Sequence, residues 1–97
     1  MLNSRQRAQL RGMANDYETI LHIGKSGISE NTITQAVDAL EARELIKCKI
    51  LETCPTTVRE TADSLAEEIG ADVVQVIGSK FILYKESKNN KTIKLVK

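Results

Sequence analysis

Apolar residues recur with helical spacing after residue 29. Between residues 30 and 40 they stand at intervals of three, four and seven, the pattern of a helix with one buried face. These residues are Ile33, Ala36, Val37 and Leu40. Ser29 is a suitable N-cap, and Glu30 falls in the first turn, where the helix dipole favours an acid. We therefore expect a helix that begins after Ser29 and buries those four side chains.

A second helical pattern lies near the N-terminus, in the stretch RQRAQLRGMA. Asn3 or Ser4 can cap this helix, and its apolar residues can share one side. Those residues are Ala8, Leu10, Met13 and Ala14. Gly12 weakens the helix by up to about 1 kcal/mol relative to alanine, so we expect the helix to depend on packing against the rest of the protein.

A third helix is predicted after Thr57, which forms a capping box with Glu60 and follows Pro55. Its apolar residues again fall on one side of a helix. They are Val58, Ala62, Leu65, Ala66 and Ile69. Gly70 then supplies the left-handed residue that commonly ends a helix.

Four short runs have the length and composition of strands. They are TILHIG at 19–24, LIKCKIL at 45–51, VVQVIG at 73–78 and FILYKE at 81–86. In LIKCKIL the alternation predicts a half-buried strand with Lys47 and Lys49 on a cationic outer face. In TILHIG it places His22 on the same face as Ile20, and we expect His22 to be a partly buried strand residue rather than a ligand or a base.

The expected order of elements is therefore α-β-α-β-α-β-β. Strands separated by helices favour parallel pairing, whereas the last two strands, joined by a tight turn near Gly78 and Ser79, form an antiparallel hairpin. We expect an α+β fold (a two-layer α/β arrangement) with a small mixed four-stranded sheet. Ninety-seven residues fit one compact domain, so residues 1–97 are predicted to form a single domain.

Composition agrees with an ordinary soluble protein, since 41% of the residues are apolar and 28% are charged. The sequence contains no apolar run of membrane-spanning length and no signal-peptide core, so we expect no membrane association and a cytoplasmic location. The chain contains two cysteines, Cys48 and Cys54, and one histidine. Because tetrahedral zinc needs four ligands, we expect two free thiols, no metal and no cofactor.

Charge is unevenly distributed, although the net charge is only +1. Residues 1–29 hold four basic and two acidic side chains, residues 30–77 hold four and ten, and residues 78–97 hold six and one. A fold that brings the two ends together would therefore display a basic face. Taken alone, residues 89–97 are expected to be a solvated basic tail.

The stretch HIGKSGIS contains two glycines three residues apart. A P-loop would need another glycine at the position of Thr19, where the chain is instead an apolar strand. A G-x-x-G turn can also let the backbone approach a phosphodiester, because neither end residue has a side chain. The helix after Ser29 would point free amides and a partial positive charge toward the turn, and Lys25 and Ser26 could contact phosphates. Taken alone, the motif is a weak signal and fits a plain turn between a strand and a helix better than a backbone clamp.

Catalysis is not expected. Ser26 lacks the G-x-S-x-G elbow and a suitably spaced histidine, so it is not a candidate nucleophile. The acids of the middle segment fall at polar positions of helices, where solvation explains them. They are Asp38, Glu41, Glu44, Glu60, Asp63, Glu67 and Glu68. We predict a protein that is not an enzyme and has no small-molecule substrate.

Four segments in this order and spacing resemble the CRM domain family (chloroplast RNA splicing and ribosome maturation), and more closely its stand-alone bacterial YhbY-type members. The segments are LRGMA, ILHIGKSGIS, ALEARELIKCKI and VVQVIGSKFILYKES. The resemblance runs from about Ser4 to Lys88. It implies an RNA-binding domain with the same order of elements, similar to the C-terminal domain of translation initiation factor three. It also implies association with precursors of the large ribosomal subunit, as in bacterial members, with the loop motif on Gly24, Lys25, Ser26 and Gly27.

We therefore predict a protein that binds ribosomal RNA and assists assembly of the large subunit, with the oligomeric state open and a monomer expected. The candidate RNA-binding residues are Gly24, Lys25, Ser26, Gly27, Arg5, Arg7, Arg11, Lys47, Lys49 and Lys80. Six phosphate contacts to a single strand would give a slope of log affinity against log salt of roughly −4. The strands lack the paired aromatic platform of an RRM, which disfavours base stacking on the sheet.

An alternative from another class is a protein-interaction adaptor whose acidic helices bind a basic partner such as a ribosomal protein. Lys25→Glu separates the two hypotheses, because a charge reversal opposes phosphate binding. The adaptor should instead depend on Glu67 and Glu68.

Overall fold

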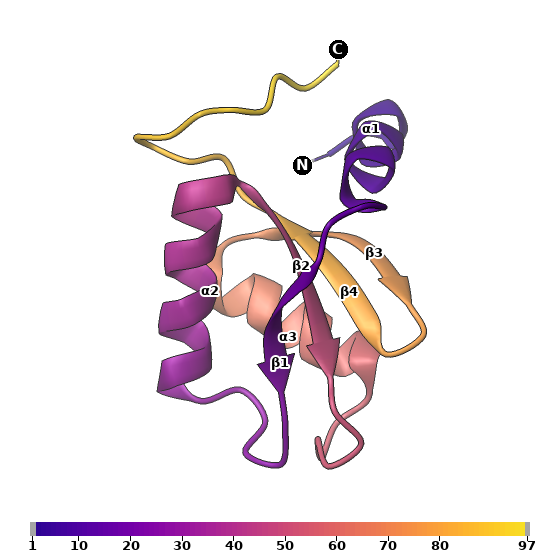
Figure 1. The fold of residues 1–97 in the computed structure, drawn as a ribbon, viewed down its shortest axis with the longest axis vertical. Helices are drawn as coiled ribbons and strands as arrows, with labels where there is room; N and C mark the ends of the chain where they lie inside the picture. The colour runs from indigo at the N-terminus through magenta and orange to yellow at the C-terminus, as the bar shows by residue number, and fades with distance from the viewer. Residues whose placement is uncertain (1, 97) are drawn as a thin grey trace.

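A computed structural model of the protein describes residues 2–96, and its three helices and four strands follow the predicted order (Figure 1). The elements are α1 (Ser4–Ala14), β1 (Thr19–Ile23), α2 (Glu30–Arg43), β2 (Leu45–Ile50), α3 (Val58–Ile69), β3 (Asp72–Ile77) and β4 (Lys80–Tyr84). The expected α+β fold with a mixed four-stranded sheet is confirmed.

The strands form one sheet in the order β1-β2-β4-β3. β1 pairs with β2 in parallel, whereas β4 lies antiparallel to both β2 and β3. The β3–β4 hairpin folds back so that β4 occupies the place beside β2, with Cys48 opposite Phe81. β1 and β3 are consequently the two edges of the sheet.

The residues predicted to cap the helices occupy cap positions in the structure. Asn3 forms a capping box with Gln6 at the start of α1, and Thr57 forms one with Glu60 at the start of α3. The Ser29 side chain accepts the backbone N–H of Thr32, which satisfies one of the free amides at the start of α2.

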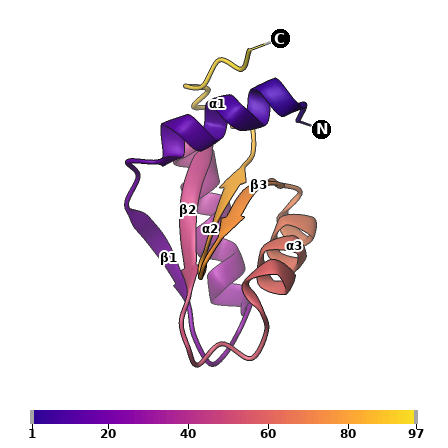
Figure 2. The ribbon, with the colours of Figure 1, turned by 90° about the vertical axis from the view of Figure 1, so that its right-hand side faces the viewer.

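Two apolar cores lie on opposite faces of the sheet. The larger core joins α2 and α3 to the sheet around Phe81, Leu83 and Ile46. The smaller core joins Leu10 and Ala14 of α1 to the other face, around residues that include Leu45, Ile82 and Tyr84. Figure 2 shows α1 lying across one end of the sheet. The helices are thus divided between two faces, an arrangement that the apolar pattern did not predict.

Because α1 covers only one end of its face, part of that face remains open. His22 is exposed rather than partly buried, so that prediction was wrong. Ile77, on β3, is 57% exposed.

Val37 was also wrongly assigned to the core: it lies at the border of the apolar stripe of α2 and is 40% exposed.

The C-terminal segment is packed along α1 instead of being a solvated tail. The Gln6 and Gln9 amide groups donate to the carbonyl oxygens of Val96 and Lys94 at 2.9 Å and 2.8 Å. Ile93 packs against the smaller core, as does Leu95. The two basic ends of the chain therefore lie together, which is the condition under which the charge pattern implies a basic face. Lys97 lies outside the described residues.

Glu44 holds the start of this segment and is buried, which corrects its assignment to a solvated helix face. Its carboxylate accepts backbone N–H groups from Ser87 at 2.8 Å, Thr92 at 2.6 Å and Ile93 at 2.9 Å. Burial acts to raise the pKa of Glu44, but these donors outweigh it and hold the pKa below its usual value. Glu41 is half-buried and accepts the Asn89 N–H at 3.0 Å.

None of the helices in residues 2–96 has both the length and the apolar character needed to span a membrane.

Candidate nucleic-acid interface

The glycine motif forms a tight turn at the end of β1. The Gly27 N–H donates to the Gly24 carbonyl oxygen at 2.9 Å, and Gly27 has φ +62°, which favours glycine. Lys25 and Ser26, at the tip of the turn, are both exposed. The turn is therefore open to a ligand, with the start of α2 directly behind it.

The segment that follows β2 supports this turn. The Leu51 N–H donates to the Ile23 carbonyl oxygen at 2.8 Å. A methyl group at Gly24 would lie 3.5 Å from Leu51 Cδ1 and 3.6 Å from Thr53 Oγ1, and one at Gly27 would lie 3.7 Å from Pro55 Cγ. The two loops are side by side at the lower end of the molecule in Figures 1 and 2.

Two predicted lysines lie on the open part of the sheet near this end. Lys49 of β2 is directly opposite Lys80 of β4, and the Ile50 N–H donates to the Ser79 carbonyl oxygen at 2.8 Å. Like charges placed opposite one another in a ladder are destabilising. We refer to Gly24–Gly27, Lys49 and Lys80 together as the loop surface.

Two other predicted residues have structural contacts instead. The Lys47 ammonium is 3.5 Å from the carbonyl oxygen of Ala14 and 3.4 Å from that of Tyr17, so it satisfies the end of α1. Arg7 donates to the Val73 carbonyl oxygen and ties α1 to β3. Both side chains hold α1 against the sheet.

The remaining predicted arginines are exposed on α1, at the other end of the molecule from the glycine turn (Figures 1 and 2). They are Arg5 and Arg11. The molecule extends 38 Å along its longest axis, so the structure does not bring them together with the loop surface. The sequence pattern grouped ten residues, and the structure places six of them, those of the loop surface, away from the α1 end of the molecule.

The cations of the loop surface have no acidic partner among residues 2–96. The ion pairs in that part of the chain are Arg59 with Asp63 and Lys91 with Glu86. Lys25, Lys49 and Lys80 place three positive charges at this end of the molecule, and one acid, Glu52, lines a hollow together with Lys49 and Ser79. The local charge is therefore positive in a protein of nearly neutral net charge.

Polar residues that the sequence pattern did not single out lie beside Lys80. Asn15, Gln75 and Ser79 line an open hollow of about 430 Å³ between the end of α1 and the β3–β4 turn. Asn15 and Gln75 are far apart in the sequence, and only the folding of α1 over the sheet brings them to one place. Sequence spacing contains no signal for them.

No three His, Cys, Asp or Glu side chains within the described residues are grouped as a metal site. Cys48 and Cys54 are free thiols, as predicted. Burial raises the pKa of Cys48 to about 12, so this thiol is a packing residue of the larger core.

Fold and surface together define a class: a small α+β protein with a glycine turn at a helix N-terminus and unpaired lysines beside it. The chain belongs to the CRS1 / YhbY (CRM) domain family, whose model matches residues 2–85. The resemblance stated from the sequence is therefore confirmed.

Individual relatives match along nearly their whole length. The chain is 42% identical over 95 residues to "Probable RNA-binding protein YqeI" of Bacillus subtilis, covering 98% of this chain and 99% of the relative. It is 29% identical over 90 residues to "RNA-binding protein" of Haemophilus influenzae, covering 93% and 91%. The solution structure of the hypothetical protein SAV1595 from Staphylococcus aureus superposes with a TM-score of 0.82 at 45% identity, covering 99% of this chain and 100% of that one.

Proposed function

We propose that this protein binds single-stranded RNA through the loop surface. The observation that carries the proposal is the exposed Gly24–Gly27 turn, which lies at the positive end of α2 beside unpaired lysines. The names of its relatives, which describe RNA-binding proteins, support the same class of ligand.

The phosphodiester backbone of the RNA binds against the turn between Gly24 and Gly27. Free amides at the start of a helix and the helix dipole favour an anion there, and Lys25 adds a full charge. Ser26 donates a hydrogen bond to a phosphate oxygen. The RNA strand then passes over Lys49 and Lys80. These two lysines repel each other, and the negative charge of the RNA relieves that repulsion.

The RNA we propose is ribosomal RNA in precursors of the large ribosomal subunit, where the protein assists assembly in the cytoplasm without catalysing a reaction. This part of the proposal rests on the resemblance to the bacterial YhbY-type members of the family. Crosslinking in cells followed by sequencing of the bound RNA, with cosedimentation on a sucrose gradient, tests it. Recovery of other RNA classes without ribosomal RNA would overturn this part and leave RNA binding intact.

Charge reversal tests the loop surface directly. Lys25→Glu should weaken binding of a short single-stranded RNA at least tenfold, because attraction to a phosphate becomes repulsion. Lys94→Glu is the matched control: it makes the same charge change at an exposed residue of the C-terminal segment. Fluorescence anisotropy over a range of salt concentrations measures both variants.

The wild-type slope of log affinity against log salt should be roughly −2, for three lysine contacts to a single strand. This value replaces the steeper one expected when all the predicted cations act together. Equal losses in both variants would mean that net charge rather than the loop surface supplies the affinity. Unchanged RNA binding in Lys25→Glu, with loss of a basic protein partner on reversal of Glu67 and Glu68, would favour the adaptor.

A further inference from the structure

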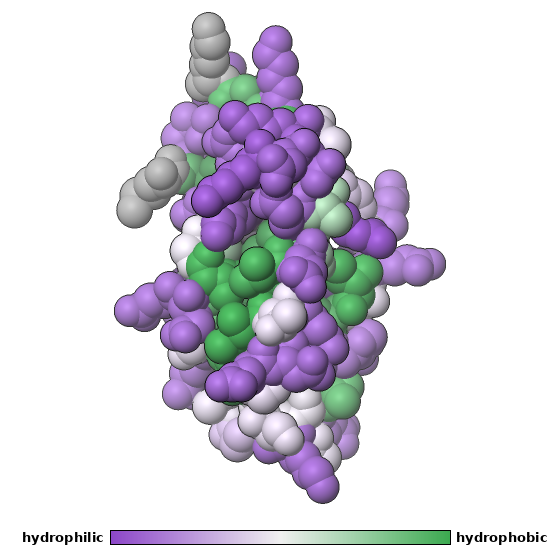
Figure 3. Space-filling model, turned by 90° about the vertical axis from the view of Figure 1, so that its left-hand side faces the viewer, coloured by the Kyte–Doolittle hydropathy of each residue, from purple (hydrophilic) through white to green (hydrophobic). Residues whose placement is uncertain are grey.

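A hollow lined by both apolar and charged side chains lies at the end of β1 opposite the glycine turn. It has a volume of about 310 Å³ and lies between the start of β1, the end of α2 and the start of β2. Figure 3 shows apolar side chains gathered in the middle of one face of the molecule and bordered by hydrophilic ones. Tyr17 and Ile20 are each 37% exposed.

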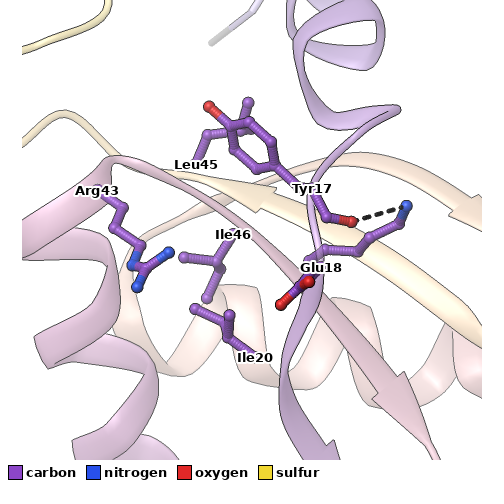
Figure 4. Close-up of a pocket in the computed structure, with 7 residues that line it drawn as sticks. Tyr17, Glu18, Ile20, Arg43, Leu45 and Ile46 are labelled. Atoms are coloured by element: carbon purple, nitrogen blue, oxygen red, sulfur yellow. Dashed lines mark hydrogen bonds between the residues drawn. The ribbon is translucent and has the colours of Figure 1, made fainter.

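Two hydrogen bonds fix the backbone of Tyr17 beside this hollow. The Tyr17 N–H donates to the Ala14 carbonyl oxygen at 3.0 Å, and Lys47 donates to the Tyr17 carbonyl oxygen (Figure 4). The pairing of β1 with β2 is irregular between Thr19 and Leu21, so the start of β1 departs from regular pairing with β2. Tyr17 is therefore presented by a segment that is fixed at both of its backbone groups.

The lining combines an aromatic ring with charges of both signs: Glu18 and Arg43 are exposed, and the Lys47 ammonium donates to the Tyr17 carbonyl oxygen. Arg43, in the last turn of α2, and Glu18 extend toward the apolar centre formed by Ile20 and Ile46 (Figure 4). A phosphate group would meet the Glu18 carboxylate and be repelled. An aliphatic side chain of a protein partner would leave both charges without a partner. A flat, neutral, heteroaromatic ring that carries both donors and acceptors satisfies all the groups at once.

We propose that this hollow binds one unstacked nucleobase of the RNA strand held at the loop surface, and that it prefers a base with an exocyclic amino group. The base stacks on Tyr17, its amino group donates to Glu18, and Arg43 donates to a base acceptor. This inference rests on the proposed function. The turn and the hollow are at the two ends of β1, which is roughly 16 Å long at about 3.3 Å per residue, so one short strand contacts both.

Variants of Tyr17 test the stacking. Tyr17→Ala should weaken binding of short oligoadenylate and oligocytidylate by roughly 5- to 150-fold, the range for loss of one stacked base. Tyr17→Phe should retain the affinity, because the ring remains. Val96→Ala removes another exposed apolar side chain, in the C-terminal segment, and should have no effect. Thermal unfolding of each variant monitors the fold.

Glu18→Gln tests the base preference. The wild-type protein should bind oligoadenylate and oligocytidylate more tightly than oligouridylate, and Glu18→Gln should reduce this difference severalfold, since an amide can donate to uracil as well as accept. Amide chemical shifts of residues 17–20 and 43–47 should move when cytidine monophosphate is added.

The outcomes separate this inference from the proposed function. If Lys25→Glu weakens RNA binding and Tyr17→Ala does not, the proposed base-binding hollow is contradicted and the loop surface is supported. If Tyr17→Ala loses RNA and Lys25→Glu does not, the backbone clamp is wrong and the hollow is the principal site. Equal affinity for all bases in the wild type would contradict the assigned role of Glu18.

Discussion

Gly24 and Gly27 bound the same turn but differ in what the fold requires of them. Gly27 has φ +62°, a conformation that costs other residues roughly 1–2 kcal/mol. Gly24 has no positive φ, and a methyl group there would make only ordinary contacts with Leu51 and Thr53. The fold therefore explains glycine at residue 27, whereas at residue 24 the proposed approach of an RNA backbone explains it.

Alanine substitutions separate these two causes. Gly27→Ala should lower the free energy of unfolding by roughly 1 kcal/mol, because alanine is strained at positive φ. Gly24→Ala should leave stability within about 0.5 kcal/mol of the wild type, because the methyl group makes only ordinary contacts with Leu51 and Thr53. It should weaken RNA binding severalfold, because the proposed RNA backbone lies close to the main chain at this residue. Urea unfolding and fluorescence anisotropy measure the two quantities. Normal RNA affinity in Gly24→Ala would show that the backbone does not approach at that residue.

At the scale of elements, Glu44 joins α2, β2 and the C-terminal segment. It stands at φ 65°, at a helix end where glycine is common. Its backbone N–H donates to the Leu40 carbonyl oxygen at 2.7 Å, while its carboxylate receives the amides of the C-terminal segment. The carboxylate offsets the strain of a left-handed residue, and the ladder of β2 begins at the next residue.

This arrangement predicts a pH dependence of stability. Hydrogen-bond donors hold the pKa of Glu44 below 4.5, and the Asn89 N–H together with the Ser87 hydroxyl lowers that of Glu41. The contribution of each carboxylate is therefore present above pH 4.5 and is lost as the pH falls through the lowered pKa of the folded state. Glu44→Gln should lower the free energy of unfolding by about 1–2 kcal/mol at pH 7 and flatten its decline in acid.

Urea unfolding of the wild type and of Glu44→Gln between pH 7 and pH 3 measures the effect. Glu67→Gln, at an exposed carboxylate of α3, is the matched control and should follow the wild type. Parallel curves for Glu44→Gln and the wild type would contradict the assigned role of the buried carboxylate.

Helices and strands could be predicted closely from the sequence, because caps and apolar periodicity act locally. Ser29, Thr57 and Gly70 mark helix ends by chemistry that depends only on neighbouring residues. The roles of Glu44 and Lys47 could not be predicted in this way. Each depends on a partner more than 30 residues away, and an acid or a lysine at a polar position otherwise predicts a solvated side chain.

On the scale of the whole molecule, the fold separates two basic regions that the sequence pattern treated as one. α1 and the C-terminal segment gather Arg5, Arg11 and Lys94 at one end, while Lys25, Lys49 and Lys80 lie toward the other. Charge counts along the chain show that both ends are basic, but they contain no information about the distance from those ends to the glycine turn. The three-dimensional arrangement therefore reduces the candidate site to the loop surface.

Chemical-shift mapping of the whole protein with a short single-stranded RNA tests this account most directly. Isotope-labelled protein is titrated with the RNA at low salt, and the amide of each residue is followed. The account predicts that the largest shifts fall in residues 24–29, 49–55 and 78–80, with further shifts at 17–20. Shifts confined to α1 and residues 88–96, with residues 24–29 unchanged, would contradict it.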